Sequence, residues 1–293
     1  MPKQRLDVLL VERNLCETRQ QAQRVIRAGE VKVNQQVVDK PGTEIDLVAL
    51  VEVRQKPPYV SRGGEKLTKA IAHFQISVSD RICLDGGIST GGFTDCLLQA
   101  GAAHVYGIDV GYGQVAWTVR QDPRVTLLER TNLRHLKPED LYMSDRPIAD
   151  LGVLDVSFIS ITKVLAALHS LLQPPREVVL LVKPQFEVGR DRIGKNGVVR
   201  DPADQANAIL QVLQAAQALG WVYCGLTWSP LVGPAGNIEY LLWLQGEDVS
   251  LKNEGKTENA TQPKSPPDFQ ALKQVTLQAQ QELTRRTLPK ADS

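Results

Sequence analysis

Short apolar runs alternate with helical patterns through the longest part of the chain. Seven mostly apolar runs are typical of buried strands: ICLD at 82–85, VYGIDV at 105–110, VTLLE at 125–129, LGVLDVSF at 151–158, VVLLVK at 178–183, WVYCGLTW at 221–228 and IEYLLWLQ at 238–245. Between them, the segments 114–120, 161–172 and 203–219 have the spacing of helices. This alternation predicts an α/β fold with a doubly wound, mostly parallel sheet. The last two runs have no helix between them, which favours an antiparallel closing pair.

The first 54 residues have a different pattern and predict a small α+β domain. RLDVLLVERNL at 5–15 has the spacing of a helix, and a second helix begins at Thr18, which has capping-box spacing with Gln21. Gly29 is a natural end for that helix, and VKVNQQVV at 31–38 then predicts a strand, a turn and a strand. The KPPY stretch breaks the pattern, so we expect a linker at 55–60 and the large domain at 61–245.

The residues from 246 to 293 begin with a polar stretch rich in Lys, Asn, Thr and Pro. This composition predicts a flexible linker. After it, FQALKQVTLQAQQEL at 269–283 has apolar residues at helical spacing. The pattern leaves open whether this helix packs on the large domain or stays free.

Composition and charge exclude several classes of protein. The 293 residues carry a net charge of only +1, so nucleic acid would need a local basic patch. A membrane-spanning helix needs about 18 apolar residues in a row, and the longest apolar runs of this sequence are much shorter. The N-terminus also lacks the apolar core of a signal peptide. The four cysteines and four histidines are scattered. We therefore expect a cytoplasmic protein with reduced thiols, no membrane association and no metal site.

A glycine-rich loop, LDGGISTGGF at 84–93, follows the first strand of the large domain and opens a helix. It fails the G-x-G-x-x-G fingerprint of dinucleotide sites and has no P-loop lysine. What remains is Asp85 at a strand end, a turn with Gly87, Ser89 and Gly91, and Asp109 at the end of the next strand. An acid at that position can accept hydrogen bonds from ribose hydroxyls. These residues together resemble an S-adenosylmethionine pocket. The alternative interpretation is a tight strand–helix turn with two capping acids.

Four charged residues are predicted to meet at one edge of the sheet. Lys183 and Asp155 lie at the carboxyl ends of predicted parallel strands, where ligands bind in open α/β sheets. Glu239 opens the antiparallel closing strand and so belongs to the same edge. Lys66, in SRGGEKL, precedes the first strand and can fold over the mouth. The simpler alternatives are a solvated Lys66, a surface Glu239 and an internal Lys183–Asp155 ion pair.

The N-terminal domain carries cations that are candidates for binding RNA phosphates. Arg24 and Arg27 are three residues apart and share a helix face. An ordinary solvated helix is the alternative. The candidate RNA-binding residues are Lys3, Arg5, Arg19, Arg24, Arg27 and Lys32.

Several of these motifs, in this order, resemble the TlyA family, whose members are called hemolysin A-like proteins or rRNA ribose methyltransferases. They are SRGGEKL, LDGGISTGGFTDCLLQAGAAHVYGIDVGYGQ, LDVSFIS, LVKPQFE and NIEY. The resemblance covers roughly residues 3 to 245. It implies an S4 RNA-binding domain followed by a Rossmann-like, seven-stranded methyltransferase domain of the FtsJ type, which uses S-adenosylmethionine.

The resemblance also implies roles for individual residues. The catalytic tetrad of the family corresponds to Lys66, Asp155, Lys183 and Glu239. The cofactor-binding residues correspond to Asp85, Gly87, Ser89, Thr90, Gly91, Phe93, Asp109 and Asn132. From its own position, Phe93 is expected in the core.

The implied reaction is methyl transfer to the 2′-hydroxyl of a cytidine in large-subunit rRNA, and in some members also in small-subunit rRNA. Lys183 would act as the base, which a neutral lysine can do. The partners would be ribosomal RNA or ribosomal subunits. One rival is an S4 protein whose methyltransferase-like domain is inactive. A membrane-active hemolysin is another, and a nicotinamide oxidoreductase is already weakened by the failed fingerprint.

Overall fold

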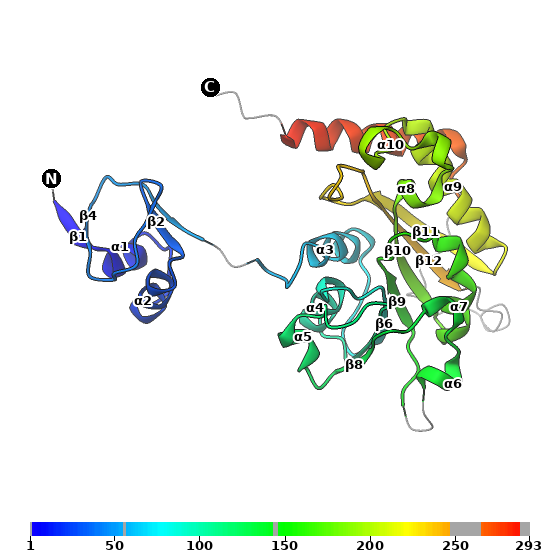
Figure 1. Ribbon diagram of the computed structural model, residues 1–293, viewed down its shortest axis with the longest axis horizontal. Coiled ribbons are helices and arrows are strands. Elements are labelled where there is room, and N and C mark those ends of the chain that lie inside the picture. Colours follow the sequence, from blue (N-terminus) through cyan, green and yellow to red (C-terminus); the bar gives the residue numbers. More distant parts are fainter. Residues whose placement is uncertain (1, 55–56, 143–145, 247–264, 288–293) are drawn as a thin grey trace. The chain divides into compact units, whose positions relative to one another are not determined.

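The computed structural model describes residues 2–54, 57–142, 146–246 and 265–287 (Figure 1). It divides into two compact units, Met1–Pro57 and Pro58–Ser293. Residues 55–56 of the expected first linker, and most of the polar stretch after residue 246, lie outside the described residues.

The N-terminal unit is an α+β module with its own core. Thr18 caps its second helix by accepting a hydrogen bond from the Gln21 backbone N–H at 3.2 Å. Leu6, Leu10, Ile26 and Val31 are fully buried between the helices and strands. The predicted strand–turn–strand is present, whereas three further strands of three residues each are too short to show a pattern. The elements are β1 Lys3–Arg5, α1 Leu6–Glu12, α2 Arg19–Arg27, β2 Val31–Val33, β3 Gln36–Val37, β4 Glu44–Asp46 and β5 Val51–Val53.

The second unit is built on one seven-stranded sheet within the described residues. The sheet has the order β11-β12-β10-β9-β6-β7-β8. β12 runs antiparallel to both β10 and β11, and the other neighbouring strands are parallel. The α/β fold and the antiparallel closing pair are therefore confirmed. The strands are β6 Ile82–Gly86, β7 His104–Ile108, β8 Val125–Leu128, β9 Leu151–Leu154, β10 Glu177–Val182, β11 Trp221–Trp228 and β12 Tyr240–Gly246.

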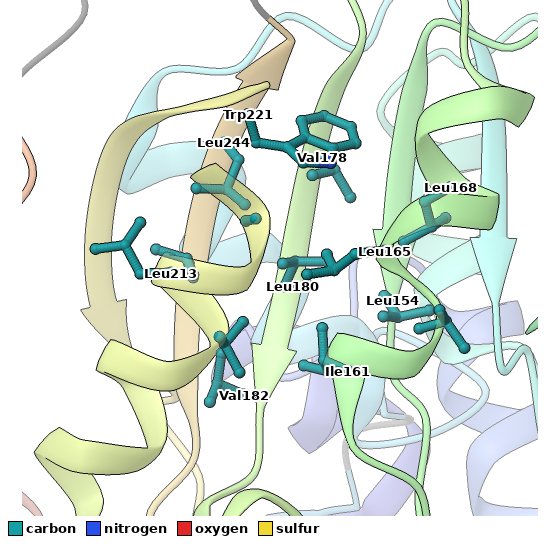
Figure 2. Packing of buried hydrophobic residues seen from close by; sticks show 14 of the residues in the cluster. Leu154, Ile161, Leu165, Leu168, Val178, Leu180, Val182, Leu213, Trp221 and Leu244 are labelled. Carbon is teal, nitrogen blue, oxygen red and sulfur yellow. The ribbon is translucent and has the colours of Figure 1, made fainter. Parts of the chain in front are cut away.

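Both faces of this sheet are covered by helices, which explains the unbroken apolar sequence of β10. Val178, Leu180 and Val182 face one core, shown in Figure 2, while Val179 and Leu181 face the other. A strand buried on both faces gains from apolar residues at every position. The helices are α3 Gly63–Phe74, α4 Gly92–Gln99, α5 Trp117–Arg120, α6 Pro138–Leu141, α7 Leu165–Leu171, α8 Pro184–Glu187, α9 Pro202–Gln217 and α10 Phe269–Thr287, with 3₁₀ turns η1 Leu133–His135, η2 Ile161–Lys163, η3 Arg190–Arg192 and η4 Lys195–Gly197.

The C-terminal helix α10 packs along α9 (Figure 1). Leu272 and Ala279 are fully buried in the core. The Thr276 hydroxyl donates to the Pro202 carbonyl at 2.9 Å, and the Gln280 amide donates to the Arg200 carbonyl at 2.6 Å. Among the described residues, no helix has the length and apolar character that crossing a membrane requires.

In the second unit, the predicted helix before β8 and the predicted strand at 151–158 differ most from the structure, and both differences lie at the edge of the sheet. The expected helix at 114–120 begins only at Trp117, and the run LGVLDVSF leaves the sheet after Leu154. After β9, the apolar residues Val156, Phe158 and Ile159 continue in a loop that lines a pocket. Before α5, only Gln114 lines that pocket, and Val115 packs with Ile88 and Val119.

Candidate active site

The glycine loop after β6 passes close to the end of β9. Gly87, Ser89 and Gly91 have positive φ angles of 82°, 49° and 98°. A side chain at Gly87 would place its Cβ 2.7 Å from the Asp155 carbonyl oxygen. Glycine is needed here because the left-handed backbone and the close neighbour both exclude larger residues. The loop therefore brings the end of β6 against Asp155.

A pocket with a volume of about 430 Å³ opens beside this loop. Cofactor sites are usually concave spaces of about this size. Asp109 lines it, and its two carboxylate oxygens accept from the backbone N–H groups of Gly111 at 2.7 Å and Ser89 at 2.8 Å. The lining residues are Gly87, Ser89, Ile108, Asp109, Val110, Gln114, Thr131, Asn132, Leu133, Asp155, Val156, Ser157, Phe158, Ile159 and Val164.

The eight predicted cofactor residues divide into two groups. Gly87, Ser89, Asp109 and Asn132 line the pocket. The other four, Asp85, Thr90, Gly91 and Phe93, are not among the lining residues. Phe93 is 3% exposed and packs in the core, as its own position in the sequence suggested.

Asp85 is fully buried at the end of β6. Its Oδ2 accepts a hydrogen bond from the Thr94 hydroxyl at 2.6 Å, while Oδ1 has no hydrogen-bond partner among the described residues. Burial raises the pKa of this carboxyl to about 7, and the charges of Asp155 and Asp109 add to the effect. At the end of β6, directly before the glycine loop, the structure thus has a buried carboxyl group whose Oδ1 accepts no hydrogen bond from the described residues.

Replacing Asp85 with asparagine is expected to flatten the pH dependence of stability. The folded state binds a proton here that the unfolded state, with an ordinary pKa of 3.8, has already released. This stabilising contribution is complete below about pH 4 and is lost as the pH rises through about 7, by up to about 4 kcal/mol. Urea unfolding at pH 5 and pH 8 measures the free energy of unfolding of D85N and of the wild type. The stability of D85N relative to the wild type should be higher at pH 8 than at pH 5. An equal difference at both pH values would contradict the prediction.

Lys183 follows β10 and forms the first of two buried ion pairs. Its ammonium lies 2.6 Å from Asp155 Oδ1 and donates to the Ser157 hydroxyl at 2.7 Å. Lys183 is 7% exposed, whereas Asp155 and Ser157 both line the pocket. The cost of burying the amine is thus offset by a carboxylate and a hydroxyl at the pocket wall.

Lys66 and Glu239 form the second pair, with 2.6 Å between Nζ and Oε2. Both residues are buried, at 8% and 2% exposure. Val182 pairs with Tyr240 across the sheet, so Lys183 and Glu239 flank the same end of neighbouring strands. Lys66 reaches this edge from the first turns of α3. The four predicted catalytic residues therefore gather at one edge as two lysine–carboxylate pairs.

Sequence reasoning missed several residues of the loop that follows Asp155. Ser157 contacts Lys183, and Phe158 is 92% exposed with a φ of 65°. Both stand in the LDVSFIS motif, but the apolar run suggested a continued strand. The signal available was the position of Ser157, two residues after an acid at a strand end.

The predicted RNA-binding residues all lie at the surface of the N-terminal unit. Lys3, Arg24, Arg27 and Lys32 are exposed. The remaining two, Arg5 and Arg19, are about half exposed and both bind the fully buried Asp7 carboxylate at 3.0 Å. Hydrogen bonds from these guanidinium groups hold the pKa of Asp7 well below its usual range. Arg5 and Arg19 therefore also support the fold of this unit.

Comparison with known proteins agrees with this architecture. The FtsJ-like methyltransferase family matches residues 59–246, and the S4 domain matches residues 4–47. The 16S/23S rRNA (cytidine-2′-O)-methyltransferase TlyA of Mycobacterium tuberculosis is 49% identical over 254 residues, which are 86% of this chain and 93% of that protein. Hemolysin A of Brachyspira hyodysenteriae is 41% identical over 237 residues, 81% of this chain and 98% of that one.

A solved structure from Streptococcus thermophilus, of a protein described as a hemolysin, superposes with a TM-score of 0.69. It is 40% identical in sequence, and the match covers 98% of both chains. The chain belongs to the TlyA family of FtsJ-like methyltransferases that carry an S4 domain at the N-terminus.

Proposed function

We propose that this protein methylates the 2′-hydroxyl of a cytidine ribose in ribosomal RNA, using S-adenosylmethionine. The observation that carries the proposal is the position of Lys183. Its amine is held by two residues of the pocket wall, at the edge where the glycine loop and Asp109 also lie. The relative from M. tuberculosis is named for this reaction.

The pocket residues fit S-adenosylmethionine. The Asp109 oxygens retain capacity for ribose hydroxyls, because each accepts only one backbone N–H. Asn132 is exposed in the pocket wall, and the family resemblance implies that it lies near the adenine of the cofactor. Gly87 contributes bare backbone to the pocket wall, whereas Asp85 is fully buried and lies outside that wall. When bound, this cofactor supplies an electrophilic methyl group.

Each of the four charged residues then has its own role in the reaction. Lys183, as a neutral amine, takes the proton of the 2′-hydroxyl, because a hydroxyl is a poor nucleophile until it begins to lose that proton. Asp155 orients the Lys183 amine through their 2.6 Å contact. Glu239 orients Lys66 in the same way, and Lys66 places the ribose. Holding oxygen and methyl carbon in line contributes most of the rate enhancement.

A methyl-transfer assay on ribosomal subunits tests this proposal. Tritiated S-adenosylmethionine is incubated with the protein and purified large or small subunits, and the 2′-O-methyl sites are mapped. The expected result is label at a cytidine of the large subunit, with the small subunit as a second target. Absence of label on both subunits would favour the alternative of an RNA-binding protein with an inactive domain.

RNA binding by the N-terminal unit is expected to depend on the exposed end of α2. Replacing Arg24 and Arg27 together with alanine removes two cations from its last turn. We expect about a 10-fold weaker Kd for rRNA and a log–log salt dependence that is shallower by about 1 to 2. Lys40→Ala, which removes an exposed cation from the loop before β4, is the matched control. An unchanged salt dependence would argue for a merely solvated helix.

A cytoplasmic location follows from ribosomal RNA as the substrate.

A further inference from the structure

The Lys183 nitrogen has two fixed neighbours besides its own side chain. Asp155 Oδ1 lies at 2.6 Å and Ser157 Oγ at 2.7 Å. An amine nitrogen is tetrahedral, so its own carbon and Ser157 Oγ occupy two of its four directions. The Asp155 contact is an ion pair without hydrogen-bond geometry, so it attracts the amine but fixes no N–H direction. Among the described residues, the hydrogen bond to Ser157 is therefore the contact that fixes the rotation of the amine, and it restricts the lone pair of a neutral lysine to the remaining directions.

We infer that Ser157 is a positioning residue that directs the lone pair of Lys183 toward the substrate hydroxyl, an inference that rests on the proposed methyl transfer. Ser157 is suited to this task because a serine hydroxyl accepts from Lys183 and still has its own proton to donate into the pocket. Asp155 alone supplies charge but leaves the rotation of the amine undetermined.

The loop that carries Ser157 is held by the same segment that carries Lys183. Glu187, four residues after Lys183, accepts from the Ile161 backbone N–H at 2.8 Å and from the Ser160 hydroxyl at 2.6 Å. The rings of Phe158 and Phe186 lie 5.3 Å apart. Three contacts between 157–161 and 183–187 therefore fix the distance from Ser157 to Lys183. Such a built geometry is what a positioning hydroxyl requires.

Ser157 gains no proton in the reaction. As the ribose oxygen forms its bond to the methyl carbon, the bond from that carbon to sulfur breaks and leaves a neutral thioether. The hydroxyl proton moves to Lys183 Nζ, which becomes an ammonium with three N–H groups. One of these still donates to Ser157 and the charge stays paired with Asp155, so the contacts before and after transfer are the same. Bulk solvent then takes the third proton.

The test compares Ser157→Ala with Ser157→Thr, which keeps the hydroxyl. We expect S157A to lower kcat by about 10- to 100-fold, with KM for ribosomal subunits and Kd for S-adenosylmethionine within about twofold of wild type. S157T should recover most of kcat. Ser170→Ala, which removes an exposed serine hydroxyl on α7, should behave as wild type. Equal kcat for S157A and wild type, or a loss confined to KM, would overturn the inference.

A second measurement does not depend on methyl transfer. The protein is treated with acetic anhydride, and acetylation of Lys183 is quantified by mass spectrometry relative to the exposed Lys163 in the same sample. Losing the Ser157 contact should raise the Lys183 ratio several-fold in S157A and not in S157T. An unchanged ratio would refute the contact even if the wild type proved inactive on ribosomal subunits. If the wild type is inactive on ribosomal subunits but the Lys183 ratio still rises in S157A, the proposed substrate is wrong. Ser157 then remains the partner that holds Lys183.

Discussion

Lys183→Ala is expected to lower kcat for rRNA methylation by about 10³-fold, while the Kd of S-adenosylmethionine changes by less than about twofold. The loss follows because general-base catalysis commonly contributes 10²- to 10⁴-fold, and no second amine is recorded against Asp155 among the described residues. Cofactor affinity should survive because Lys183 is not among the residues that line the pocket. Single-turnover methyl transfer and calorimetric titration measure the two quantities.

Lys163→Ala is the matched control for this variant, since Lys163 is an exposed lysine in η2. Removing Lys183 also leaves Asp155 without its cation, but the Asp155 side chain is 23% exposed and can be hydrated. The variant should therefore stay folded, which thermal unfolding checks. Retained turnover in a folded K183A would refute the assignment of Lys183 as the base.

The sheet and the edge that carries the candidate site were predictable because strand periodicity and strand direction together constrain where side chains go. VVLLVK is apolar at every position because both faces of β10 are covered. Parallel direction then sends Asp155 and Lys183 to one edge, and the antiparallel β12 brings Glu239 there from its start. These inferences need only the order and direction of strands.

The partners within the site were not predictable in the same way. That Lys66 pairs with Glu239 depends on where α3 packs against the closing strands, which is a tertiary contact without a local pattern. Ser157 was missed because its neighbours are apolar residues that line the pocket, and their apolar pattern is the same as that of a buried strand. The complete burial of Asp7, which makes Arg5 and Arg19 part of the fold, has no signal in the local sequence.

Breaking the Lys66–Glu239 pair is expected to reduce both stability and turnover. Glu239→Leu leaves the Lys66 amine buried without its carboxylate, which typically costs about 3 to 5 kcal/mol. Urea unfolding followed by tryptophan fluorescence measures this cost, because all four tryptophans lie in the second unit. Turnover should fall by at least about 10²-fold, since Lys66 can no longer be oriented at the ribose.

The double variant Lys66→Met, Glu239→Leu separates the two effects. Two apolar side chains of similar size remove both buried charges, and such replacements are often neutral or stabilising. We expect the free energy of unfolding to return to within about 1 kcal/mol of the wild type, while methyl transfer stays as low as in the single variant. A pair that served only the fold would give the opposite pattern, with turnover recovering together with stability. The same preparation answers both questions, because a folded, cofactor-binding but inactive double variant assigns the pair to catalysis, and a folded, active one assigns it to packing.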